Sequence, residues 1–79
     1  MKIPELKPGK VSVIRAESAT GIILNNDGVR YQSAGEDFYK IFDNMEDAKH
    51  YIVNDKISSV ITCEYLIYNS QGVFTEMIS

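Results

Sequence analysis

The chain has 79 residues and a net charge of −3, from eight lysine and arginine residues against eleven aspartate and glutamate residues. A chain of this length makes one small domain, and its scattered basic residues exclude the basic patch that a nucleic-acid partner requires. It contains no signal-peptide core and no run that approaches the roughly 18 apolar residues of a membrane span, so we expect a cytoplasmic protein with no membrane partner.

Cysteine and histidine each occur once. Cys63 cannot form an internal disulfide, and His50 does not complete a zinc-ligand cluster with it. Small domains commonly gain stability from disulfides, metals or oligomerisation. By elimination the sequence favours self-association, with a homodimer as the candidate form.

The first half of the chain predicts strands. Residues 1–9 hold two prolines and a glycine, which predicts an extended lead-in before a single folded domain over residues 10–79. The cluster Asn25–Gly28 contains residues that tolerate positive φ and predicts a reversal of the chain. Alternation and β-branched or apolar composition predict strands at Val11–Ala16, Thr20–Leu24, Val29–Gln32 and Phe38–Phe42.

The pattern changes at Asp43. The run from Asp43 to Glu46 is a D-x-x-E variant of the capping box, with Asp43 as the predicted N-cap, and it predicts a helix over Asp43–Asn54. Apolar residues then recur at helical spacing and form the stripe that should face a sheet. The stripe comprises Met45, Ala48, Tyr51, Ile52 and Ile57.

The last part of the chain predicts a hairpin. Val60–Tyr68 is the most strongly β-forming segment, and Asn69–Gly72 separates it from a second strand over Val73–Ile78. The predicted fold class is therefore α+β: an antiparallel sheet of about five to six strands with one helix packed on it, in the chain order β-β-β-(β)-α-β-β.

No residue pattern predicts catalysis, a cofactor or a metal. His50 shares a helix surface with Glu46 and Asp47 but has no accompanying nucleophile, so a solvated helix face is the favoured interpretation. Cys63 lies mid-strand without a cationic neighbour or a helix N-terminus, which is typical of a small core residue. The Asn25–Gly28 cluster lacks the EF-hand spacing, and the glycines lack any phosphate-binding pattern.

The C-terminal strands carry the strongest functional signal. Leu66 and Tyr68 alternate with the core-type residues of their strand, and one helix covers only part of one sheet face. We therefore predict a protein-interaction surface at Leu66, Tyr68, Phe74 and Ile78. The N-terminal strands, a second copy of the chain or another protein could each cover it.

The leading hypothesis is a non-enzymatic module that self-associates or binds another protein through this apolar sheet face. The alternative is a small acidic inhibitor or immunity-type protein that masks a basic site on an enzyme. A small enzyme has support only from His50, Cys63 and the carboxylates. RNA binding on the exposed aromatics is disfavoured because the RNP1 run is absent and the charge is negative.

Overall fold

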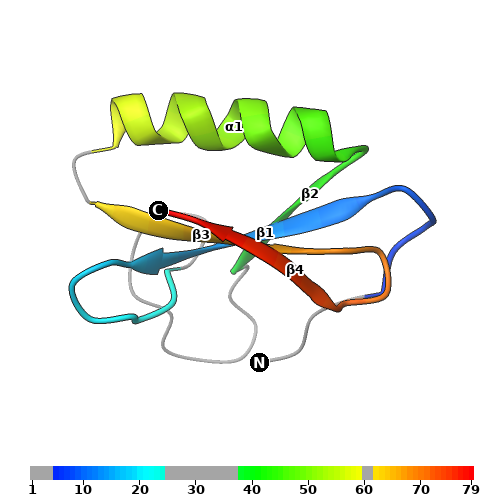
Figure 1. Cartoon of the computed structure of the whole chain (residues 1–79), viewed down its shortest axis with the longest axis horizontal. Coiled ribbons are helices and arrows are strands. Elements are labelled where there is room, and N and C mark those ends of the chain that lie inside the picture. The colour runs from blue at the N-terminus through cyan, green and yellow to red at the C-terminus, as the bar shows by residue number, and fades with distance from the viewer. Residues whose placement is uncertain (1–4, 25–37, 60–61) are drawn as a thin grey trace.

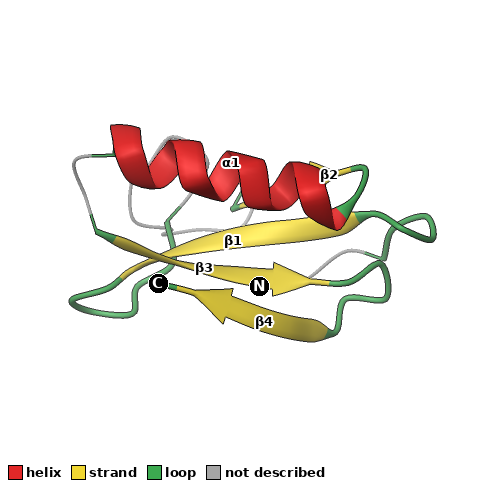
Figure 2. Cartoon of the chain, turned by 45° about the horizontal axis from the view of Figure 1, so that its top comes forward, coloured by secondary structure: helices red, strands yellow, loops and turns green. Residues whose placement is uncertain are grey.

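The computed structural model describes residues 5–24, 38–59 and 62–79, and these residues form two layers (Figure 1). In chain order the elements are β1 (Val11–Glu17), β2 (Tyr39–Phe42), α1 (Met45–Ser58), β3 (Cys63–Tyr68) and β4 (Phe74–Ile78). The strands form one antiparallel sheet in the order β2-β1-β3-β4. Figure 2 shows α1 lying across one face of this sheet, nearest to β1 and β2.

The predicted α+β class, with one helix on an antiparallel sheet, is confirmed, but the described residues contain four strands and not five or six. Within the predicted strand Thr20–Leu24, isolated β-bridges occur at Ile23 and Leu24, and Ile23 lies opposite Ala16, after a turn in which Gly21 has φ +73°. The predicted reversal at residues 25–28 and the predicted strand at 29–32 lie outside the described residues.

The helix begins later than predicted because its N-cap is Asn44. The Asn44 backbone is extended, and its side-chain Oδ1 accepts the backbone N–H of Asp47 at 2.8 Å. Asp43 Oδ1 instead accepts a hydrogen bond from Lys10 Nζ at 2.6 Å, and this contact lowers the pKa of the Asp43 carboxyl group. The capping motif is therefore the N-x-x-D frame, one residue on from the D-x-x-E frame.

The helix also continues one turn beyond the predicted end at Asn54, because Asp55 lies on its inward face. The predicted stripe is correct for Ala48 and Ile52, which are buried. It is wrong for Ile57, which is 80% exposed. Asp55 occupies the inward position of this last turn, three residues after Ile52, and its carboxylate has partners in the sheet that hold the turn in place.

The core lies between α1 and the sheet. Alternate residues of β1 and β3 face the helix. On this side β3 buries Cys63, Tyr65 and Ile67, and β1 buries Val11 and Val13. The buried cluster consists of Val11, Val13, Leu24, Ala48, Ile52, Cys63, Tyr65 and Ile67, with Phe42, Met45, Tyr51 and Ile78 packed against it.

The hairpin between β3 and β4 forms as predicted. Gly72 donates its N–H to the Asn69 carbonyl at 3.0 Å and has φ +77°, and Asn69 donates to the Val73 carbonyl at 2.9 Å. A hydrogen-bonded turn that ends in a left-handed glycine therefore closes a three-residue hairpin loop. The lead-in residue Leu6 donates its N–H to the Ser70 carbonyl in the same turn at 2.7 Å.

Candidate interaction surface

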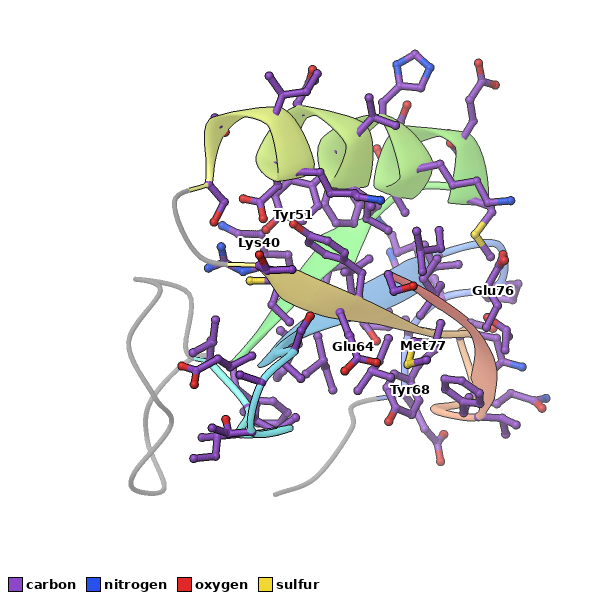
Figure 3. The ribbon with its side chains drawn as sticks, turned by 60° about the vertical axis from the view of Figure 1, so that its left-hand side comes forward. Lys40, Tyr51, Glu64, Tyr68, Glu76 and Met77 are labelled. Atoms are coloured by element: carbon purple, nitrogen blue, oxygen red, sulfur yellow. The ribbon has the colours of Figure 1, made fainter. Side chains whose placement is uncertain are left out.

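The sheet face opposite α1 carries three of the four predicted interaction residues, together with one that was not predicted. Strand pairing sets Tyr68 opposite Phe74 and Leu66 opposite Met77. The Tyr68 and Phe74 rings meet edge to face, with centroids 5.8 Å apart. Figure 3 shows Tyr68 and Met77 on the side of the sheet away from Tyr51 of the helix. We call Leu66, Tyr68, Phe74 and Met77 the outer patch.

Exposure on this face rises steeply from β1 to β4. Ser12 and Ile14, the β1 partners of Tyr68 and Leu66, are 0% exposed although they point away from the helix. Leu66 and Tyr68 are half-buried. Phe74 and Met77 are each 50% exposed. The single chain therefore closes the outer face over β1 and leaves apolar surface along β4.

Ile78 does not lie on this face. It pairs with Tyr65 and packs against the core on the helix side. The cause is a β-bulge: Tyr68 pairs with Phe74, but Ile67 pairs with Glu76, which leaves Thr75 as the extra residue. The Thr75 hydroxyl donates to the Ile67 carbonyl at 3.0 Å.

The bulge shifts the alternation of β4 by one residue, so Met77 takes the outward position that simple alternation gives to Ile78. Period-2 alternation from Phe74 places residues 76 and 78 on the Phe74 face, and it therefore missed Met77. The sequence carries no separate signal for the extra residue.

A buried polar cluster joins the helix to the sheet. The Asp55 carboxylate contacts the Arg15 guanidinium at 3.3 Å and accepts the Tyr65 hydroxyl at 2.6 Å. The Asp55 and Arg15 side chains are only 15% and 13% exposed, and Tyr65 is fully buried. Burial, followed by the hydrogen bond to Asp55, raises the pKa of Tyr65 well above its ordinary value. The Asp55 carboxylate therefore joins the end of α1 to β1 and β3, which is a structural role.

This cluster predicts a loss of stability at alkaline pH. An unfolded tyrosine loses its proton near pH 10, whereas folded Tyr65 keeps it, so the unfolded chain gains in stability as the pH rises further. We expect the free energy of unfolding to fall above about pH 10, by up to about 1.4 kcal/mol per pH unit for this group. Chemical denaturation between pH 8 and 11 tests this, and Tyr65→Phe should show a shallower fall. An equal fall in both proteins would contradict it.

His50 and Cys63 do not lie close together. His50 is exposed on the outward surface of α1, and Cys63 is buried beneath it in the sheet. Burial raises the pKa of the Cys63 thiol, which lowers the fraction of reactive thiolate at neutral pH. Over residues 5–24, 38–59 and 62–79, no group of three His, Cys, Asp or Glu side chains is arranged to hold a metal ion.

A small open pocket of about 110 Å³ lies where α1 ends. Its lining residues are Lys56, Ser59, Thr62, Cys63, Tyr65 and Ser79. Small-molecule sites usually enclose about 300 Å³ or more, so this hollow has the size of a few water molecules. In the part of the chain that the structure describes, no helix is long and apolar enough to cross a membrane.

The chain matched no protein-family model, no curated protein and no solved structure. A function must therefore be argued from its own residues.

Proposed function

We propose that the protein is a non-enzymatic interaction module whose partner is a second copy of itself, bound through the outer patch. The observation that carries this proposal is the exposure gradient across the outer face. The chain buries Ser12 and Ile14 of β1 within itself, yet it leaves the side chains of Phe74 and Met77 half exposed on β4, on the other side of β3.

The composition of the outer patch suits an interface. Aromatic residues and methionine are enriched where proteins meet, and lysine and glutamate are depleted. The patch contains two aromatic rings, a leucine and a methionine, and Glu64 is the nearest charged residue along the outward side of β3. Because the patch carries no charge, a second copy meets no like-charge repulsion there. An identical apolar surface is self-complementary in a two-fold dimer.

The alternative of an acidic inhibitor receives less support. A basic partner would need a cluster of open carboxylates, but three are already bound by cations within the chain. Lys10 contacts Asp43 at 2.6 Å and Lys49 contacts Glu76 at 3.4 Å. Arg15 contacts Asp55, which is also buried. These contacts neutralise acidic charge that such an inhibitor would present.

The variant Phe74→Glu tests the proposal. The substitution removes an aromatic anchor from each copy and places two glutamates in the two-fold interface. Such anchors contribute about 2 kcal/mol or more to the binding free energy. We expect the dimer dissociation constant to rise by at least about 30-fold, as measured by sedimentation equilibrium. Phe74 is half exposed, so helix and sheet content should remain unchanged by circular dichroism.

The matched control is Val53→Glu. Val53 is 57% exposed, similar to Phe74, but it lies on the far surface of α1. We expect no change in association for this variant. Equal weakening by both substitutions would point to a general charge effect, and weakening by neither would show that the outer patch is not the interface.

A further inference from the structure

β4 is an edge strand that could pair with a further strand. Among residues 5–24, 38–59 and 62–79 it is the last strand of the sheet, with β3 on one side only. Edge strands are normally guarded by lysine, proline, a β-bulge or inward-pointing charge. Two such features occur in β4: the bulge at Thr75 and the inward-pointing Glu76. Lys49 of the helix offsets the charge of Glu76, and the bulge precedes residues 76–78, which pair regularly with β3. The backbone of β4 can therefore accept another strand.

The backbone of Met77 points toward this open edge. Antiparallel pairs alternate between those that exchange hydrogen bonds and those that do not. Asn69 donates its N–H to the Val73 carbonyl across the hairpin. Because backbone groups point to the same side at every second residue of a strand, those of Ile67 and Tyr65 also point toward β4. The intervening pair, Leu66 with Met77, does not exchange these bonds, and the N–H and C=O of Met77 face away from β3.

We propose that β4 pairs antiparallel with β4 of a second copy, with Met77 opposite its own equivalent across a two-fold axis. The two four-stranded sheets then join into one sheet of eight strands. This inference rests on the proposed function and specifies how the second copy binds. The two outer patches become continuous across the new strand pair.

Charge selects this register. A two-fold axis at Met77 sets Glu76 of one copy opposite Ile78 of the other, and both residues lie on the helix-facing side. An axis at Glu76 would set the two glutamates directly opposite each other, and like charges in that position destabilise a strand pair. The strand is thus complementary to itself at Met77.

The size of the outer patch also favours edge pairing. Stable complexes bury about 800 Å² per partner, roughly a sixth of this chain's surface of 4985 Å². Half of an aromatic side chain such as Phe74 supplies only about 100 Å². The four residues of the patch therefore need help from neighbouring surface, and the adjacent backbone edge supplies it together with directional hydrogen bonds.

Disulfide trapping tests the pairing directly. In the background Cys63→Ala, the substitution Met77→Cys would bring two thiols together across the two-fold axis. Hydrogen-bonded antiparallel pairs have Cα atoms about 5.5 Å apart, within the range that disulfides span. Under mild oxidation at a concentration where the parent dimerises, we expect most of the protein to run as a covalent dimer on a non-reducing gel.

The control is Val73→Cys in the same background. Val73 is 55% exposed in the same hairpin. In the proposed register its two copies lie eight residue steps apart, about 26 Å, and cannot be bridged. Equal cross-linking at positions 73 and 77 would indicate random collision and overturn the inference.

A second variant avoids reliance on oxidation. Met77→Lys sets two ammonium groups opposite each other and adds a further protection to the edge strand, so we expect at least a tenfold weaker dimer by sedimentation. If Phe74→Glu weakens the dimer but Met77→Cys does not cross-link it, edge pairing is contradicted and the proposed function stands. A wild-type monomer would contradict both.

Discussion

Replacing Asp55 with alanine is expected to lower the free energy of unfolding by about 3 kcal/mol. The carboxylate sits between the Arg15 guanidinium and the Tyr65 hydroxyl, with little exposure to water. Its removal takes an acceptor from each of these two buried groups, and breaking a buried ion pair costs more than the pair was worth. Urea unfolding measures the loss.

Two further variants separate this cause from the loss of any carboxylate. Asp43→Ala removes the exposed partner of Lys10 and should leave the urea midpoint almost unchanged, because exposed ion pairs contribute little. The triple variant Arg15→Met, Asp55→Leu and Tyr65→Phe replaces the whole cluster with apolar groups, and we expect it to be more stable than Asp55→Ala. If Asp55→Ala were no less stable than Asp43→Ala, the cluster would have no structural role.

Replacing Ile52 with alanine is expected to destabilise the protein by about 2 to 4 kcal/mol. Ile52 is buried at the centre of the contact between α1 and the sheet. Alanine leaves a cavity there that the rigid sheet cannot fill, so the lost contacts add to the lost burial. Thermal and urea unfolding both report the change.

Ile57→Ala is the matched control, because it makes the same chemical change five residues along the same helix. Ile57 is 80% exposed, so we expect an effect within about 0.5 kcal/mol. Equal losses for the two variants would mean that α1 presents a different face to the sheet.

Much of the fold could be predicted from the sequence because its local signals agree with its packing. The predicted alternation of Leu66 and Tyr68 with core-type residues is confirmed in β3, where the intervening Cys63, Tyr65 and Ile67 are buried. The hairpin turn was correct because Gly72 supplies the left-handed conformation that the turn requires. The helix was recognised from its polar start and its apolar stripe.

The errors arose where tertiary contacts decide between neighbouring residues. Asp43 and Asn44 are both good N-caps, and Lys10, 33 residues away, draws Asp43 out of that position. From the sequence, the polar Asp55 suggests the end of the helix, but its contacts with Arg15 and Tyr65 place it inside the last turn. No local pattern reveals these long-range partners.

The candidate surface was predicted in part. Leu66, Tyr68 and Phe74 share one face as expected. The bulge at Thr75 exchanges the places of Ile78 and Met77, and a one-residue shift in β4 cannot be detected from apolar spacing alone. The open edge of β4 became apparent only with the order of the strands, since sequence gives no order for them.

Sedimentation equilibrium of the wild-type chain tests the central claim most directly. One chain has a mass of 8.9 kDa. Self-association through the outer patch predicts that the average mass rises toward twice this value as the concentration increases from about 1 to about 200 micromolar, a range that covers typical weak and moderate dimers. A mass that stays at 8.9 kDa throughout that range would contradict the claim.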